Sequence, residues 1–360
     1  MTISKPTLLV MAGGTGGHIF PGLAVAQELQ QQGWQVHWLG TPERMEAQVV
    51  PKYDIPISFI NIKGLRGKGL SSWLWAPFKM LNAVWQSIKI LKQVKPDVVL
   101  GMGGYASAPG GVAAWLTGVP LVLHEQNAVA GMSNRYLAKF ATQVLSAFPG
   151  AFNNDVPHQV VGNPVRQNIA TLNKAKSNGR NVLIVGGSLG AKVLNDTLPE
   201  TLALCPELAL NIRHQTGAGN SPQVKAKYLS LNVAEEKIQV DDFIDDMASA
   251  YQWADLVICR AGALTVSELA LAATPAIFVP LPHAVDDHQT ENARFLVDQD
   301  AAILLPQYNL SANTLVTELK ALFESPDKLV EMAENCHKAA APEATLKVAN
   351  ACQALVIKNE

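Results

Sequence analysis

The sequence predicts an α/β protein of two doubly wound domains that face each other across a cleft. Apolar, strand-like runs alternate with helix-length segments along nearly the whole chain of 360 residues. The runs are continuously apolar, which is typical of parallel strands buried on both faces. Two glycine-rich turns lie about half a chain apart, at residues 13–18 and 186–191. Together these observations favour two Rossmann-like sheets that hold a ligand between them.

The expected strands fall into two sets of six. Helical segments separate them, which implies right-handed crossovers within each sheet. The first set comprises residues 7–11, 35–39, 57–60, 97–100, 120–123 and 143–145. The second set comprises residues 181–185, 208–214, 238–240, 256–259, 276–279 and 302–304.

A change of pattern at residues 161–166 marks the expected domain boundary. Asn163-Pro164 follows a glycine and breaks regular structure, and a new strand–loop–helix cycle begins soon afterwards. We therefore expect an N-terminal domain of residues 1–163, a C-terminal domain of residues 164–340, and a hinge for domain closure at Asn163-Pro164. The last segment, residues 341–360, has a helical pattern and is expected to pack back on the first domain.

Composition excludes several classes of protein. A hydrophobic content of 48% with 16% charged residues fits a globular chain, and a net charge of −2 argues against general nucleic-acid binding. The four cysteines lack metal-ligand spacing, so we expect buried, reduced thiols. Residues 98–123 carry no charge, but the six glycines and two prolines among them argue against a membrane span. We expect a soluble protein.

The glycine-rich turns do not match two common nucleotide-binding fingerprints. A dinucleotide-binding dehydrogenase needs a third glycine where Ile19 stands, and an acidic residue where the second strand ends in Gly40-Thr41. The pattern Gly-x4-Gly-Lys-Ser/Thr of phosphate-binding loops is missing as well. Glycines at a strand-to-helix turn still let a ligand approach closely, and the helix start offers free N–H groups. This arrangement favours a two-substrate transferase.

His18 falls in the first turn of the helix that follows the first glycine-rich turn. The positive end of the helix dipole disfavours a protonated imidazole, so the ring is suited to accept a proton near neutral pH. A hydroxyl nucleophile needs such a general base. The alternative is a histidine that makes only a structural hydrogen bond at the helix start.

Two further polar clusters follow strand ends in the first domain, at residues 101–105 and 124–127. Parallel strands place their carboxyl ends on one edge of the sheet, so both clusters fall on the ligand-facing edge. The second cluster contains Glu125, a further candidate base, and Asn127. A pure turn role for the glycines of the first cluster is the alternative.

The second domain contains a denser group of candidate contacts. A strand ends near Cys259 and a helix opens at about Ala263, whose free amides can hold a diphosphate with Arg260 adding positive charge. Glu268 can accept both hydroxyls of a ribose. A solvated helix face is the alternative interpretation of this segment.

Two polar motifs follow further along the second domain. Gln289 and Asn292 share one helix face, and amide side chains suit sugar hydroxyls because they both donate and accept. Asp298-Gln299-Asp300 matches the Asp-x-Asp pattern of metal-dependent nucleotide-sugar enzymes. It lies between a helix and a strand, away from the other clusters, so we interpret it as a solvated turn and expect no metal.

Aromatic and basic residues are interleaved between residues 63 and 92. The basic members of this segment are Lys63, Arg66, Lys68, Lys79, Lys89 and Lys92, and its main aromatic members are Trp73, Trp75, Phe78 and Trp85. This composition is typical of an interfacial contact with an anionic membrane. The alternative is a helix whose apolar face packs on the sheet, and the two interpretations are compatible for different faces.

The order of the motifs resembles a known family. The series reads Gly-Gly-Thr-Gly-Gly-His, Gly-Gly-Tyr, His-Glu-Gln-Asn, Gly-Asn-Pro-Val-Arg, Gly-Gly-Ser-x-Gly-Ala, Phe-Ile-Asp-Asp-Met and Arg-x-Gly-Ala-Leu-Thr-Val-Ser-Glu. Over nearly the whole chain it resembles the bacterial lipid I N-acetylglucosaminyltransferases of peptidoglycan synthesis, the MurG family within glycosyltransferase family 28. The resemblance implies a glycosyltransferase-B fold and a peripheral protein on the cytoplasmic face of the inner membrane.

The resemblance also implies a reaction. N-acetylglucosamine would pass from UDP-N-acetylglucosamine, with inversion and without a metal or cofactor, to the 4-hydroxyl of undecaprenyl-diphosphate-linked N-acetylmuramoyl-pentapeptide (lipid I). Expected partners are these two substrates, an anionic inner-leaflet surface and other cell-wall synthesis proteins. The remaining alternatives are a UDP-N-acetylglucosamine 2-epimerase, another glycolipid transferase of this fold, or a non-catalytic sugar-nucleotide-binding subunit of a larger synthase. An epimerase would not need the aromatic and basic segment.

The same resemblance implies roles for individual residues. Donor contacts are expected from Thr15, Gly16, Gly17, Asn127, Arg166, Ser188, Ile244, Arg260, Ala263, Leu264, Thr265, Val266, Ser267, Glu268, Gln289 and Asn292. Within this set, Ile244 would meet the uracil through its backbone and residues 263–268 would cradle the diphosphate and ribose. The acceptor is expected near Gly103, Gly104, Tyr105 and Asn134.

The residues and the resemblance lead to one mechanism. The acceptor hydroxyl loses its proton to His18, or to Glu125, as it attacks the anomeric carbon. The helix start at Ala263, together with Arg260, stabilises the negative charge on the departing UDP. His288 stands where family members often have glutamine, and it receives no role.

Overall fold

Residues 5–62, 75–153, 155–172, 179–187, 190–282 and 287–357 are described by the computed structural model. The chain divides into two compact units. Unit 1 comprises residues 1–166 and 343–360, and unit 2 comprises residues 167–342. The first crossing between the units thus falls after Arg166, three residues beyond the expected boundary at 163, and the return falls at Glu343.

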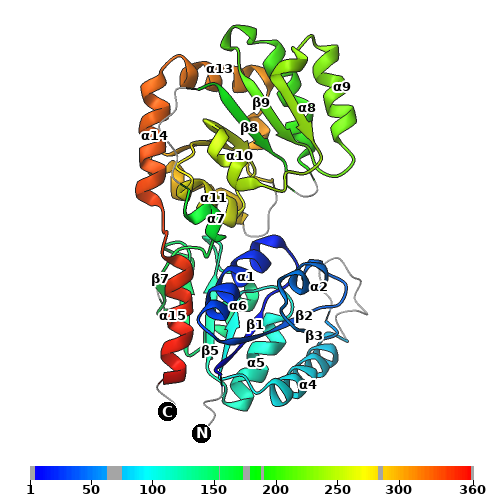
Figure 1. The fold of residues 1–360 in the computed structure, drawn as a ribbon, viewed down its shortest axis with the longest axis vertical. Helices are drawn as coiled ribbons and strands as arrows, with labels where there is room; N and C mark the ends of the chain where they lie inside the picture. The colour runs from blue at the N-terminus through cyan, green and yellow to red at the C-terminus, as the bar shows by residue number, and fades with distance from the viewer. Residues whose placement is uncertain are drawn as a thin grey trace. The chain divides into compact units, whose positions relative to one another are not determined.

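Unit 1 is built on a fully parallel, seven-stranded sheet with helices on both faces (Figure 1). The strand order is β3-β2-β1-β4-β5-β6-β7. The strands are β1 (Thr7–Met11), β2 (Gln35–Gly40), β3 (Ile57–Phe59), β4 (Val98–Gly101), β5 (Leu121–Glu125), β6 (Gln143–Ser146) and β7 (Gln159–Val160). The helical segments are α1 (Gly16–Gln31), α2 (Met45–Val49), the 3-10 turn η1 (Val50–Tyr53), α4 (Ala76–Val94), α5 (Ser107–Thr117), α6 (Met132–Leu137) and α15 (Ala344–Ile357).

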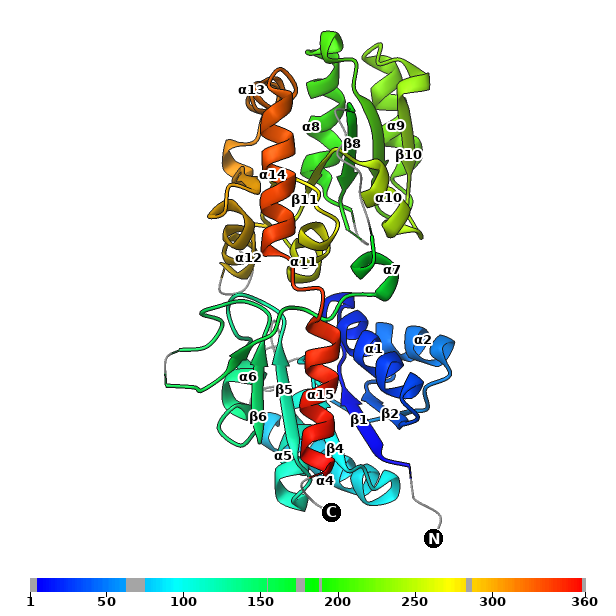
Figure 2. The ribbon, with the colours of Figure 1, turned by 60° about the vertical axis from the view of Figure 1, so that its left-hand side comes forward.

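Alternate side chains of the central strand β1 build the core on the two faces of this sheet. Leu8 and Val10 pack into the cluster formed with α1 and α15, whereas Leu9 and Met11 pack into the cluster formed with α4 and α5. All four are fully buried, as expected for a strand covered on both faces. The C-terminal helix α15 lies against α1, β4 and β5 (Figure 2), and so belongs to the core of unit 1.

Unit 2 repeats the architecture with a parallel, six-stranded sheet of order β10-β9-β8-β11-β12-β13. The strands are β8 (Asn181–Val185), β9 (Asn211–Gln215), β10 (Ile238–Asp241), β11 (Leu256–Cys259), β12 (Ala276–Phe278) and β13 (Ala302–Leu304). The α-helices are α7 (Gln167–Ala170), α8 (Lys192–Ala203), α9 (Ser221–Ser230), α10 (Met247–Trp253), α11 (Ala263–Leu271), α12 (His288–Val297), α13 (Ala312–Phe323) and α14 (Pro326–Ala339). The 3-10 turns are η2 (Pro206–Leu208), η3 (Glu235–Lys237) and η5 (Gln307–Asn309).

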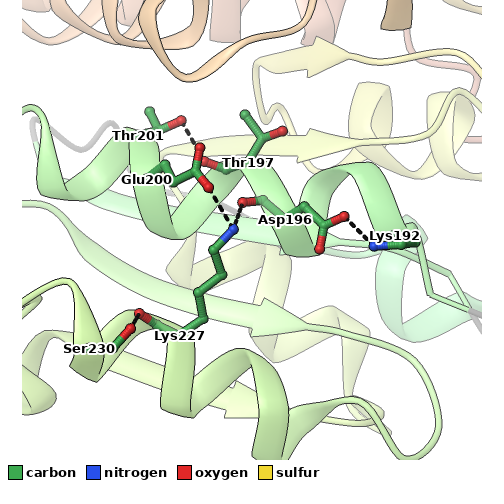
Figure 3. A network of polar contacts seen from close by, with 7 residues as sticks. All are labelled: Lys192, Asp196, Thr197, Glu200, Thr201, Lys227 and Ser230. Carbon is green, nitrogen blue, oxygen red and sulfur yellow. Dashed lines mark hydrogen bonds and ion pairs between the residues drawn. The ribbon is translucent and has the colours of Figure 1, made fainter.

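A polar network joins α8 to α9 on the surface of unit 2 (Figure 3). The Lys227 ammonium lies 2.7 Å from a Glu200 carboxylate oxygen and donates to the Asp196 carbonyl oxygen at 2.6 Å. Lys192 pairs with the Asp196 carboxylate at 2.5 Å, one helical turn away. These side chains are largely solvated, so each pair contributes at most about 1 kcal/mol to stability.

The predicted fold class, two doubly wound parallel sheets, is confirmed. The strand expected at residues 208–214 starts only at Asn211, because Pro206 opens the 3-10 turn η2. The short edge strand β7 was not predicted, since two exposed residues carry no apolar pattern. The charge-free stretch 98–123 folds as β4, α5 and the start of β5. Within the described ranges, no helix has the length and apolarity needed to cross a bilayer.

Candidate active site

The predicted motifs lie at equivalent positions in the two sheets. In unit 1 the chain runs from β1 outward to β2 and β3 and then returns to β4 on the other side of β1. The loops after β1 and β4 therefore leave toward opposite faces, which opens a crevice at the carboxyl edge where ligands bind in such sheets. The first glycine loop (residues 13–17) follows β1, and Gly103-Gly104-Tyr105 follows β4. In unit 2 the second glycine loop (residues 186–191) and Arg260 follow β8 and β11 in the same way.

The two loops of unit 1 touch each other through glycines. An ideal Cβ on Gly104 would lie 2.2 Å from the Gly13 carbonyl oxygen, so no side chain fits there. Gly103 and Gly104 both have positive φ angles, 92° and 84°, which favour glycine independently of space. The predicted acceptor loop is thereby packed directly on the first glycine loop.

His18 lies in the first turn of α1, between these two loops. Its Nδ1 is 3.3 Å from the Oγ1 of Thr15, the residue that precedes the helix. An ideal Cβ on Gly103 would lie 3.0 Å from the Cδ2 and 3.1 Å from the Nε2 of His18, so the other edge of the ring faces the Gly103 turn. Thr15 is exposed and Gly16, Gly17 and His18 are half-buried. The structure thus brings the candidate base and the predicted acceptor loop together.

The structure argues against Glu125 as an alternative base. Its side chain is 2% exposed, and Oε1 accepts from the backbone and side-chain nitrogens of Asn127 at 2.9 and 3.1 Å. Oε2 accepts from the Gly131 amide at 3.0 Å and from Asn134 Nδ2 at 2.9 Å. A carboxylate offers about four lone pairs, and all four are engaged. Glu125 therefore organises the loop after β5 through these four bonds.

Asn134 and Asn127, two other predicted substrate contacts, are both hydrogen-bonded to the Glu125 carboxylate. Asn134 is 2% exposed, and its Nδ2 also donates to the His124 carbonyl oxygen at 3.2 Å. Through these bonds Asn134 supports the loop after β5. Asn127 is fixed by Glu125 and stays half-buried at the edge.

Tyr105 and Arg166 each take part in a cation–π contact. Tyr105 is 44% exposed, and the Arg44 guanidinium lies 5.9 Å from the centre of its ring. The Arg166 guanidinium lies 5.4 Å from the ring of Phe20 on α1.

In unit 2 the glycine loop and the α11 start enclose a cavity of about 560 Å³. Its size suits a small-molecule ligand. Three predicted residues, Arg260, Thr265 and Gln289, line it together with Gly186, Gly187 and Gly190. Gln289 accepts from the Leu281 amide at 2.9 Å through Oε1, which turns its side chain toward the β12–α12 connection. Ser188 lies outside the described residues.

Arg260 is fixed in the wall of this cavity by three hydrogen bonds to oxygen atoms of uncharged groups. Nη1 donates to the carbonyl oxygens of Val279 and Pro280, both at 3.0 Å, and Nη2 donates to Gln307 Oε1 at 2.8 Å. Burial lowers the pKa of the guanidinium from its ordinary value, although arginine stays charged in proteins. Gln307 also lines the cavity and was missed, because it lies on a short 3-10 turn without a recognisable motif.

Several predicted donor residues lie beneath the cavity instead of on its wall. Val266 is fully buried in the core. Asn292 is also fully buried, and its Nδ2 donates to the Ala261 carbonyl at 3.2 Å, so it supports the turn before α11. Glu268 is 5% exposed and accepts from the Tyr251 hydroxyl at 3.0 Å. Val266 and Asn292 therefore present no side chain to this cavity.

The remaining predicted positions fall near the start of α11 or on a neighbouring loop. Ala263 is buried and Leu264 half-buried, and Ser267 donates to the Ala263 carbonyl one turn back. Ile244 is half-buried in the loop between β10 and α10. A second, larger cavity of about 710 Å³ between α8 and α9 is lined by the ion-paired Lys192, Asp196 and Lys227, and it shares Gly190 and Lys192 with the first cavity.

Two family models match this architecture unit by unit. The glycosyltransferase family 28 N-terminal domain matches residues 8–146, and the glycosyltransferase family 28 C-terminal domain matches residues 181–348. The fold and the paired sites are those of a nucleotide-sugar-dependent transferase class. The chain belongs to glycosyltransferase family 28.

Individual relatives and a solved structure narrow the comparison within this family. The chain is 56% identical to the UDP-N-acetylglucosamine--N-acetylmuramyl-(pentapeptide) pyrophosphoryl-undecaprenol N-acetylglucosamine transferase of Colwellia psychrerythraea, over 98% of this chain and 94% of that one. The transferase of the same name from Shewanella denitrificans is 51% identical over the full length of both chains. The crystal structure of Acinetobacter baumannii MurG matches with a TM-score of 0.83 and 44% identity, covering 97% of this chain and 99% of that one.

The buried imidazole of His124 gives a prediction about pH. Nε2 lies 2.9 Å from the Gly162 carbonyl and Nδ1 lies 3.0 Å from Gln126 Nε2, which suits a neutral ring that donates once and accepts once. Burial lowers its pKa from 6.5 to about 4. Between pH 6.5 and 4, therefore, His124 binds a proton in the unfolded chain but not in the folded chain. Its contribution to the free energy of unfolding is fully present above pH 6.5 and is lost as the pH falls toward 4. The loss is about 3 kcal/mol.

Urea unfolding of wild type and His124→Gln at pH 7, 5.5 and 4.5 tests this expectation. Tryptophan fluorescence reports mainly on unit 1, because Trp253 is the only one of the seven tryptophans in unit 2. The wild type loses more unfolding free energy than the variant between pH 7 and 4.5. Parallel pH curves for the two proteins would show that His124 does not titrate in this way.

Proposed function

We propose that this protein transfers N-acetylglucosamine from UDP-N-acetylglucosamine to the 4-hydroxyl of lipid I, with inversion at the anomeric carbon. One observation carries the proposal: 56% identity, over 98% of the chain, to a transferase named for this donor and this acceptor. The geometry agrees, because both units present glycine loops at the crevices of parallel sheets. The product is lipid II, the disaccharide precursor of peptidoglycan.

The unit 2 cavity is assigned to the UDP moiety. Arg260 lines it with a guanidinium that uncharged oxygen atoms hold in place, and Gly262 and Thr265, which also line it, belong to the start of α11. A helix start and a fixed cation favour a diphosphate, and they favour it more as negative charge grows on the leaving group. The proposal gives no step to a metal or cofactor.

The unit 1 edge is assigned to the acceptor and to proton transfer. His18 takes the proton of the 4-hydroxyl while the hydroxyl oxygen forms its bond to the anomeric carbon. The bond from that carbon to the UDP oxygen breaks, and both bonding electrons leave with UDP. Thr15 holds Nδ1 of the ring, which orients the Nε2 edge toward the Gly103 turn.

Turnover by the purified protein tests the function itself. Incubation with UDP-N-acetylglucosamine and a lipid I analogue is expected to release UDP and form the disaccharide in equal amounts, as measured by chromatography and mass spectrometry. Interconversion of the UDP-sugar without disaccharide would instead indicate an epimerase. Binding of UDP without either reaction would indicate a non-catalytic subunit.

Replacement of the candidate base gives a sharper prediction. His18→Ala is expected to lower kcat about 10²–10⁴-fold, the usual contribution of a general base. UDP affinity, measured by calorimetry, is expected to stay near the wild-type value because the UDP cavity belongs to unit 2. A variant with wild-type turnover would remove His18 from this role.

The outer face of α4 is assigned to an anionic membrane surface. Four large apolar side chains at its exposed side, Trp75, Phe78, Leu81 and Trp85, are 55–66% exposed. The opposite face buries Ala83, Val84 and Leu91, as the core interpretation expects, and the exposed face is the one that we assign to the membrane. Trp73 and residues 63–68 lie outside the described residues.

Basic and aromatic neighbours strengthen this assignment. The Lys89 ammonium lies 3.4 Å from the centre of the Trp85 ring, and Lys79 and Lys92 are also exposed on α4. On the adjacent α5, Trp115 is 53% exposed and stacks against Phe140 with ring centres 5.0 Å apart. Aromatic rings with flanking lysines suit the headgroup region of an anionic leaflet. The proposed location is therefore the cytoplasmic face of the inner membrane.

Charge insertion into this face gives the membrane prediction. Trp75→Glu with Phe78→Glu is expected to weaken sedimentation with phosphatidylglycerol vesicles about 100-fold, because two apolar insertions are lost. The thermal midpoint is expected to stay unchanged, since both side chains are exposed. The control is Leu204→Glu with Leu229→Glu, which adds the same charge at exposed apolar sites of unit 2. Equal binding by both double variants would contradict the assignment, and so would unfolding of the first.

A further inference from the structure

A single buried carboxylate joins the β2–α2 connection to the first glycine loop. Glu46, on the first turn of α2, is fully buried. Its Oε2 accepts from the Gly14 amide at 3.0 Å. Its Oε1 accepts from the backbone amide and the hydroxyl of Thr41, at 2.9 and 2.7 Å. Three donors from two loops thus converge on one side chain that neither the motifs nor the proposed mechanism uses.

The backbone on both sides is shaped to fit this carboxylate. An ideal Cβ on Gly13 would lie 2.5 Å from Glu46 Oε1, and one on Gly40 would lie 2.7 Å from Glu46 Cγ. No side chain fits at either position while Glu46 keeps its place. The adjacent Gly14 has a φ of 97°, so the loop is held in a conformation that other residues rarely adopt.

The hydrogen bond between Glu46 and the Gly14 amide is linked to His18 through Thr15. Gly14 precedes Thr15, the N-cap residue of α1, and the Oγ1 of Thr15 lies 3.3 Å from His18 Nδ1. On its other side, the loop is closed off by Gly104, packed against the Gly13 carbonyl. The first glycine loop is therefore clamped between Glu46 and the acceptor loop, and His18 projects from the clamped segment.

We infer that Glu46 is a positioning residue that sets the geometry of His18 by holding the Gly14 amide. The inference rests on the proposed function, in which His18 takes the acceptor proton. Glu46 does not touch a substrate, because its carboxylate is fully buried and its three bonds are all internal. A general base depends steeply on position, and a misplacement of about 1 Å costs about 100-fold in rate.

Glu46→Gln is the first test. The amide replaces one acceptor oxygen by an NH₂ group, which must face the donor of either Gly14 or Thr41. We expect kcat to fall about 10–100-fold, while UDP affinity and the thermal midpoint of unit 2 stay at wild-type values. A purely stabilising residue would lower the midpoint of unit 1 and leave kcat per folded molecule unchanged, and that result would overturn the inference.

A double-mutant cycle with His18→Ala is the decisive measurement. If Glu46 acts through His18, the double variant is no slower than His18→Ala alone, because the histidine to be positioned is already gone. Multiplication of the two single effects would overturn the inference. A fully active His18→Ala beside an impaired Glu46→Gln would overturn it as well. Absence of disaccharide with the wild type would contradict the proposed function instead.

Two further variants distinguish an effect on the position of His18 from a failure to fold. Gly13→Ala drives a methyl group against the same carboxylate while keeping the glutamate, and is expected to lower kcat in the same way where Glu46→Gln is insoluble. Asp97→Asn is the matched control, since Asp97 accepts from the Thr7 amide at 2.7 Å at the opposite end of β1. It is expected to keep wild-type kcat. Wild-type kcat in a folded Gly13→Ala variant would overturn the inference.

Discussion

The candidate site of unit 1 depends on the contact between the loops after β1 and β4, which meet through glycine residues. The closeness of Gly104 to the Gly13 carbonyl is possible only for glycine, and it fixes the distance between the loops after β1 and β4. That distance in turn places His18 against Gly103. The crevice of a doubly wound sheet supplies the location, because the two loops leave neighbouring strands toward opposite faces. Gly13 and Gly104 determine how closely the two loops approach each other across the crevice.

The two units use this crevice for different purposes. In unit 1 the loops close on each other, and the exposed edge retains a histidine and a tyrosine. In unit 2 the equivalent loops stay apart and leave a cavity of about 560 Å³ with a fixed guanidinium in its wall. One architecture thus yields a surface suited to proton transfer and a hollow suited to an anionic nucleotide.

Sequence reasoning reached the fold and the positions of the glycine-rich loops after the strands, but not the hydrogen-bond partners of the buried polar side chains. Continuous apolar runs identify parallel strands, and glycine after a strand identifies a ligand loop, because both follow from local chemistry. Glu125 and Glu46 show the limit. Glu125 belongs to a motif and was a candidate general base, but its carboxylate accepts four hydrogen bonds in the structure. Glu46 belongs to no motif, but its carboxylate holds the first glycine loop. The partners of a buried carboxylate are set by residues distant in sequence, which no local pattern records.

The buried carboxylates also determine which backbone amides remain for a ligand. Amides that leave a strand lose their sheet partners and need other acceptors. In the first glycine loop, Glu46 takes the Gly14 amide and the Thr15 carbonyl takes the His18 amide. The amides of Thr15, Gly16 and Gly17 lie between these two bonds, at the start of α1, where a helix offers N–H groups to a ligand. The family resemblance assigns the same three residues to the donor, and that assignment stays a prediction.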